Sequence, residues 1–159
     1  MAINVTERIN ILRPAEDIAM FMFNPKNDTD WLGGVIEVKS VSNETVMEGT
    51  EIHRVAHFLG KDIDYVLKVN KLIEGKLLST ESTVSPFPMK VEYKVEDVDD
   101  KLTPEGQPFS LVSIKIEGES KGYLMFIDRL LALMLSHNVK GDLQKLKQIM
   151  EDSDEVDDF

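Results

Sequence analysis

Residues 122–151, GYLMFIDRLLALMLSHNVKGDLQKLKQIME, carry the strongest helical periodicity in the chain. In the second half of this segment, apolar residues recur at steps of four, three and four, which places them on one side of a helix. These residues are Val139, Leu143, Leu146 and Met150. The polar residues of the same half are predicted to form its outer face: Lys140, Asp142, Gln144, Lys145, Lys147 and Gln148. We therefore expect one long C-terminal helix that packs on the rest of the fold.

The first half of the same segment is apolar on nearly every side, with Asp128 and Arg129 as its charged residues. A helix of this kind is predicted to be covered on several sides by other elements. It is not expected to cross a membrane, because a span needs about 20 predominantly apolar residues and charges interrupt this run. The segment thus predicts the central helix of a folded domain without stable membrane insertion.

Length and composition indicate one globular domain. The chain has 159 residues, of which 30% are charged and 42% hydrophobic, which is an ordinary globular composition. The formal net charge of -11 argues against a nucleic-acid partner, because phosphate binding needs clustered Lys and Arg. We expect a domain over residues 1–151, followed by an acidic flexible tail over residues 152–159 in which like charges repel one another.

The cysteine count and the first residues of the chain indicate the cellular compartment of the protein. The sequence contains no cysteine, which excludes disulfides, thiol catalysis and cysteine-ligated metals. The opening residues, MAINVTERIN, do not form the basic and apolar pattern of a secretory signal. We expect a cytoplasmic protein.

Alternation of apolar and polar residues predicts seven strands. Their ranges are 2–12, 35–41, 50–59, 62–72, 77–84, 87–95 and 109–118. Pro14 is predicted to start a helix over 15–23, which Asn24 and Pro25 end, and residues 26–32 form a second short helix or turn. Short, turn-like connections between successive strands imply hairpins, and hence an antiparallel sheet.

The same alternation places several polar side chains on the inward face of the sheet. They are Glu7, Arg54, Tyr65, Thr80, Ser82 and Tyr93. Glu7 and Arg54 are the candidate catalytic residues, and Arg54 is the natural partner of a buried Glu7 carboxylate. A structural ion pair between the two, or a position at an open rim, is the competing interpretation. Tyr65 and Tyr93 are either packing residues or hydroxyl donors to a ligand.

Several phrases of the sequence resemble a known superfamily. They are INILRPAEDIAMFMFNP, DWLGGVIEV, GTEIHRVAHFLGKDIDYVLKV, SPFPMKVEYKV and LQKLKQIME. The chain from residue 5 to about residue 151 looks like the START-like helix-grip superfamily (SRPBCC), and within it the polyketide cyclase/dehydrase and lipid-transport family. The resemblance implies an α+β helix-grip fold, with a seven-stranded curved antiparallel sheet wrapped around a long C-terminal helix and two short helices after the first strand. It brings no shared catalytic signature with it.

Such a fold leaves a cavity between sheet and helix for a small hydrophobic molecule. The residues expected to contact it are Trp31, Arg54, Phe58, Tyr65, Leu67, Thr80, Met89, Val91, Tyr93, Ile114, Leu131, Met134 and Asn138. Trp31 either gates the mouth of the cavity or plugs the space between the short helices and the sheet. Asp128 interrupts the apolar helix and either contacts the ligand or interacts with the helix dipole.

The three histidines do not predict a metal site. His53 and His57 are four residues apart on one strand, a spacing of about 13 Å that is too long for one ion. Both are expected to face solvent, and His137 is expected on the helix surface unless it turns toward the cavity. No cofactor is expected.

Three functions remain open from the sequence. The first is binding of a lipid-, polyketide- or isoprenoid-like molecule in the cavity. The second is a cyclase, dehydratase or aromatase acting on a polyketide-like carbonyl substrate. The third is an interaction module whose cavity is collapsed and whose surface carries the function, with an exposed apolar patch. Homodimer formation is left open.

Overall fold

A computed structural model of the chain describes residues 2–58, 60–85, 88–98, 108–119 and 128–157. The strands are β1 (Ala2–Ile11), β2 (Val35–Val41), β3 (Glu51–Phe58), β4 (Lys61–Ile73), β5 (Leu77–Val84), β6 (Met89–Val98) and β7 (Phe109–Glu119). The helices are α1 (Ala15–Met22), the 3-10 helix η1 (Pro25–Asn27), α2 (Asp28–Trp31) and α3 (Asp128–Asp157).

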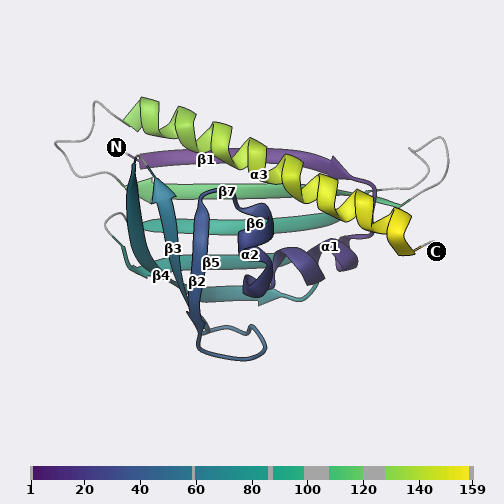
Figure 1. Ribbon diagram of the computed structural model, residues 1–159, viewed down its shortest axis with the longest axis horizontal. Coiled ribbons are helices and arrows are strands. Elements are labelled where there is room, and N and C mark those ends of the chain that lie inside the picture. The colour runs from purple at the N-terminus through teal and green to yellow at the C-terminus, as the bar shows by residue number, and fades with distance from the viewer. Residues whose placement is uncertain (1, 59, 86–87, 99–107, 120–127, 158–159) are drawn as a thin grey trace.

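All seven strands form one antiparallel sheet in the order β1-β7-β6-β5-β4-β3-β2. Strands β2 to β7 therefore make a meander, and β1 is added at its end beside β7. In Figure 1, α3 crosses the sheet obliquely over β1, and β2 and β3 run steeply across the direction of β1 and β7. The sheet thus curves around the helix, and the helix-grip fold expected from the sequence is confirmed.

The boundaries of the long helix differ from those expected. The predicted start, residues 122–127, lies outside the described residues, as does Phe87 at the predicted start of β6. At the other end, α3 continues past Glu151 to Asp157 and so enters the acidic segment that we expected to be a tail. The division into a domain and a flexible tail stays a prediction.

The two halves of α3 are covered to different extents. The stripe expected to pack inward is buried: Val139 is 4% exposed, Leu143 1%, Leu146 0% and Met150 5%. In the N-terminal half, Leu130 is 58% exposed and Leu133 68%. For the described residues 130–138, the expectation that this half is covered on several sides is therefore wrong. The N-terminal half of α3 is thus only partly covered, and its inward side borders open space.

The hydrophobic core lies at the C-terminal half of α3. The buried stripe joins residues of α1, α2 and the sheet in one cluster. Its largest fully buried members outside the helix include Ile11, Ile18, Met22, Trp31, Val69, Val95 and Val112. The two short helices thus fill one end of the space between sheet and helix, and the other end is left unfilled.

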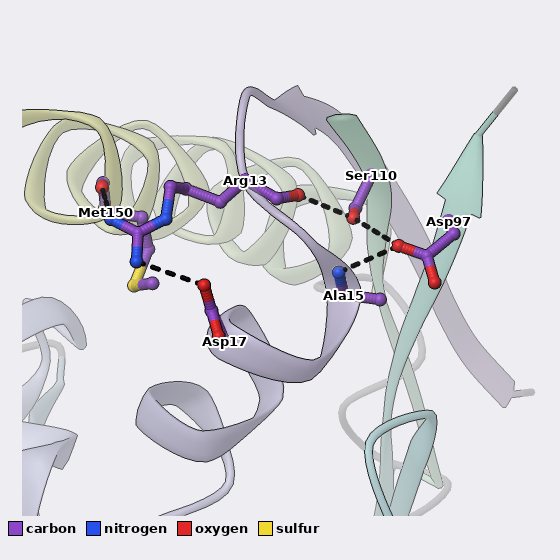
Figure 2. A network of polar contacts seen from close by, with 6 residues as sticks. All are labelled: Arg13, Ala15, Asp17, Asp97, Ser110 and Met150. Atoms are coloured by element: carbon purple, nitrogen blue, oxygen red, sulfur yellow. Dashed lines mark hydrogen bonds and ion pairs between the residues drawn. The ribbon is translucent and has the colours of Figure 1, made fainter. Parts of the chain in front are cut away.

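A polar network fixes the C-terminal half of α3 to this core (Figure 2). The Arg13 guanidinium donates to the Met150 carbonyl oxygen at 3.1 Å and pairs with the Asp17 carboxylate at 3.1 Å. The Ala15 backbone N–H at the start of α1 donates to Asp97 Oδ1 at 2.9 Å, which satisfies a donor that the helix itself leaves unpaired. The Ser110 hydroxyl donates to the Arg13 carbonyl oxygen at 2.8 Å. Strands β6 and β7, α1 and α3 are thereby held together at one end of the molecule.

The packing of α3 predicts a difference between its two halves. Replacing buried Leu143 with alanine is expected to lower the free energy of unfolding by about 2 to 5 kcal/mol, because it removes transfer energy and leaves a cavity. Leu130→Ala, at an exposed position of the same helix, is expected to change it by about 0.5 kcal/mol or less. Urea denaturation measures both. Equal losses in the two variants would contradict the packing described.

Candidate functional site

An apolar cavity of about 340 Å³ lies between the sheet and the N-terminal half of α3. Side chains of β1, β3, β4, β6 and β7 form one wall, and Leu131, Leu135 and Val139 of α3 form the other. The turn between α2 and β2, with Leu32 and Gly34, closes part of the rim. The cavity is the space that the curved sheet encloses and that one straight helix does not fill.

The structure brings most of the expected contact residues together on the cavity wall. They are Arg54, Phe58, Tyr65, Leu67, Met89, Val91, Tyr93, Ile114, Leu131 and Asn138. They meet because inward positions of β3, β4, β6 and β7 share one concave face, as the alternation in the sequence indicated. Their role as ligand contacts stays a prediction.

Three expected contact residues do not line the cavity. Trp31 is 1% exposed and packs edge-on against Tyr93, with ring centroids 5.6 Å apart; it is a plug between the short helices and the sheet. Thr80 is buried and its hydroxyl donates to the Val91 carbonyl oxygen at 3.4 Å. Met134 is half-buried on α3.

Glu7 does not meet Arg54, so the pairing suggested by the sequence is wrong. The Ser136 hydroxyl of α3 donates to Glu7 Oε1 at 2.5 Å, in a second pocket between β1 and the helix. The reason is the strand order: β1 lies at one end of the sheet and is separated from β3 by β7, β6, β5 and β4. Two residues can both face inward and still be too far apart to touch.

The partner of Arg54 is Asp28, the first residue of α2. Arg54 Nη2 lies 2.6 Å from Asp28 Oδ2, and Arg54 Nε donates to the same oxygen at 2.8 Å. Asp28 is 1% exposed and Arg54 6%. The sequence placed Asp28 in a short helical segment without a role. The signal for it was Arg54 itself, because an inward-facing guanidinium needs a buried acid.

Burial and charge act in opposite directions on this pair. Burial raises the pKa of Asp28 to about 6, against the effect of the Arg54 guanidinium. Burial opposes the charge of Arg54, but the Asp28 carboxylate and the hydroxyls of Tyr93 and Tyr65 outweigh it and raise the pKa of Arg54 above its ordinary value. Burial also raises the pKa of Tyr93. At neutral pH the site therefore holds an ion pair beside a neutral phenol.

Asp142 is a second acid of the site, although the sequence placed it on the outer face of the helix. It is half-buried, lines the cavity, and accepts a hydrogen bond from the Gly33 backbone N–H at 2.9 Å. Burial raises the pKa of Asp142 to about 6, with the Gly33 N–H opposing it. The carboxylate thus connects α3 to the turn between α2 and β2 at the rim.

The three histidines differ in their exposure and in the residues that they contact. His57 is exposed, as expected, but it also borders the cavity, and its Nδ1 lies 2.8 Å from Asp62 Oδ1. His53 is half-buried rather than open to solvent, because it contacts Asp64 of the neighbouring strand. His137 is exposed on α3. Within the described ranges, no three His, Asp or Glu side chains gather as metal ligands, and no helix is long and apolar enough to cross a membrane.

Comparisons with known proteins identify the fold. No known family and no curated protein matches the sequence. Among solved structures, a START superfamily protein from Mycobacterium smegmatis superposes with a TM-score of 0.67 at 13% identity, covering 92% of this chain and 98% of that one. A protein of unknown function from Staphylococcus aureus, SA2116, gives 0.69 at 11% identity, covering 98% and 97%. The chain therefore has a START-like fold.

The di-domain ARO/CYC BexL from the BE-7585A biosynthetic pathway is also similar, with a TM-score of 0.68 at 18% identity. The alignment covers 93% of this chain and 46% of BexL. At this level of identity the likeness concerns the fold alone, and it extends to an ARO/CYC di-domain protein as well as to a START superfamily protein.

Because Asp28 and Arg54 form an ion pair, substitutions of the two residues are not expected to be additive in their effect on the free energy of unfolding. Arg54→Met leaves the Asp28 carboxylate buried without its counter-ion and is expected to cost about 3 to 5 kcal/mol of unfolding free energy at neutral pH. The double variant Arg54→Met with Asp28→Asn removes both charges and is expected to recover most of that loss. Chemical denaturation of the wild type, the single variant and the double variant measures the difference. A double variant no more stable than Arg54→Met would contradict the assignment.

The raised pKa of Asp142 predicts a pH-dependent difference from Asp142→Asn. The folded state holds the proton of Asp142 up to about pH 6, whereas the unfolded chain releases it near the ordinary value of 3.8. As pH rises between these values, the wild type loses stability from this group, and above about 6 the loss is complete. Asparagine keeps an acceptor for Gly33 and lacks the titration. Denaturation at a series of pH values should therefore find the variant gaining on the wild type over this interval, and a constant difference would contradict the burial of Asp142.

Proposed function

We propose that the protein binds a small hydrophobic ligand, lipid-, polyketide- or isoprenoid-like, in the cavity between the sheet and α3. The observation that supports this most directly is the cavity of about 340 Å³ with mainly apolar walls. Its volume lies in the range typical of small-molecule sites, about 300 to 1,000 Å³, and such sites combine apolar walls with a few polar groups. Arg54, Tyr65 and Tyr93 are those polar groups at its buried end.

The residues that the sequence suggested as catalytic support ligand binding better than they support catalysis. Glu7 lies outside the cavity and accepts from Ser136. Arg54 is already paired with Asp28, and Tyr93 is a poorer acid than an ordinary tyrosine because burial raises its pKa. The two candidate catalytic residues therefore do not form an acid-base pair.

A cyclase or dehydratase acting on a polyketide-like carbonyl substrate is the second candidate function. Among the described residues, Asp142 is the one carboxylate on the cavity wall, and a pKa of about 6 suits a general base near neutral pH. The likeness to ARO/CYC domains is compatible with this function. Loss of turnover in Asp142→Asn with unchanged ligand binding would favour the enzyme.

The interaction-module interpretation requires a collapsed cavity, and the open space beside α3 argues against it. The observation that still favours this interpretation is the exposure of two apolar residues of the helix, Leu130 and Leu133. A cytoplasmic location stays a prediction from the sequence, and homodimer formation stays open.

Filling the cavity should prevent uptake of an apolar ligand. Val91 is half-buried on β6 with its side chain on the cavity wall, so Val91→Trp places an indole where the ligand would lie. Lys90→Trp is the matched control, because Lys90 is the exposed neighbour on the same strand. Pyrene, whose fluorescence reports apolar surroundings, is the probe.

We expect the wild type and Lys90→Trp to take up pyrene and Val91→Trp to take up little or none. Circular dichroism checks that both variants are folded. Uptake by folded Val91→Trp equal to that of the control would contradict binding in this cavity.

A further inference from the structure

The polar groups of the cavity wall fall into two sets that differ in their access to water. Arg54 and Tyr93 are buried at one end, beside half-buried Tyr65. The other set lies at more accessible positions: exposed His57 and Asn138, and half-buried Ser85 and Asp142. A polar group of a ligand that reaches the buried end must be paired there, because no solvent compensates for its lost hydration. The groups around Arg54 therefore decide which polar group is accepted.

The positive charge of Arg54 is already compensated before any ligand arrives. Arg54 Nη2 and Nε both contact Asp28 Oδ2, at 2.6 and 2.8 Å. A ligand carboxylate placed here would add a second buried anion beside one guanidinium and leave the cluster with a net negative charge. Two carboxylates that share a site repel each other, and desolvating the second one is costly.

A neutral acceptor does not have this disadvantage. A guanidinium has five N–H donors. The Asp28 carboxylate accepts from Arg54 Nε and Nη2, and the hydroxyl oxygens of Tyr65 and Tyr93 also accept from the guanidinium. The hydroxyl of Tyr65, which interacts with the Arg54 guanidinium, is a further donor on the wall. A ketone, ester or hydroxyl oxygen can accept from these groups without changing the charge of the cluster.

The accessible set of groups has the same overall preference. Asp142 brings a second carboxylate to the wall. His57 is the group that could attract an anion, but it is exposed and already lies 2.8 Å from the Asp62 carboxylate. The charges around the cavity thus disfavour an anionic ligand at both ends.

We propose that the ligand carries a neutral carbonyl or hydroxyl group at the Arg54 end, and that Asp28 is the residue that excludes carboxylates such as fatty acids. The inference rests on the proposed function and adds the chemical class of the ligand. Asp28 acts through Arg54, as a positioning and charge-compensating residue that does not itself line the cavity.

Two probes of equal chain length, decan-2-one and decanoate, test the inference by isothermal titration calorimetry. The titrations are run at about pH 8, where carboxylates with a pKa of about 6 are ionised. The variants are Asp28→Asn, which removes the counter-ion but keeps an amide acceptor, and Asp30→Asn. The second is the matched control, because Asp30 is an exposed acid on the same short helix.

We expect the wild type and Asp30→Asn to bind the ketone more tightly than decanoate by about tenfold or more. An electrostatic effect that would shift a pKa by one unit changes an equilibrium constant tenfold. In Asp28→Asn the ratio should shift toward decanoate by a similar factor. A wild type that binds decanoate as tightly as the ketone overturns the inference, as does an unchanged ratio in Asp28→Asn. If Asp28→Asn does not fold, the wild-type ratio alone decides. If the wild type binds neither probe, the proposed function itself is overturned.

Discussion

The mismatch in shape between one straight helix and a strongly curved sheet determines the rest of the molecule. Seven antiparallel strands curve around α3, but the helix packs fully only along its C-terminal half, where Leu143 and Leu146 are almost completely buried. The short helices and the Arg13 network hold that half in place (Figure 2). The N-terminal half then borders a space that nothing in the core fills, and this space is the cavity. The buried core and the proposed ligand site thus lie at opposite ends of the same helix.

The Asp28–Arg54 pair connects the two ends. Asp28 belongs to the short α2 helix, which also carries Trp31 of the core, whereas Arg54 reaches the cavity wall from β3. A buried ion pair is weak evidence for stability, because desolvation offsets its attraction. The effect of the pair on the charge of the cavity wall follows directly from its two members. A wall that carried Arg54 alone would attract anions, and the same wall with Asp28 behind it offers hydrogen-bond donors without net charge.

Local periodicity predicted the strands, their inward faces and the buried stripe of α3, because each of these depends on residues close together in sequence. The meeting of inward polar residues depends instead on strand order. Glu7 and Arg54 face the same side, but β1 joins the sheet beside β7, far from β3, so the expected pair does not form. Asp28 lies in a helix too short to have a period. Asp142 was assigned outward with the other polar residues of its half of the helix, because periodicity only separates polar from apolar residues, and yet it lines the cavity.

Native mass spectrometry of the protein purified from its own cells is the sharpest test of ligand binding in the cavity. We expect a mass above that of the chain alone, and we expect organic extraction of the complex to release one recurring apolar molecule. A mass equal to that of the unliganded chain, found repeatedly under conditions that preserve noncovalent complexes, would contradict it.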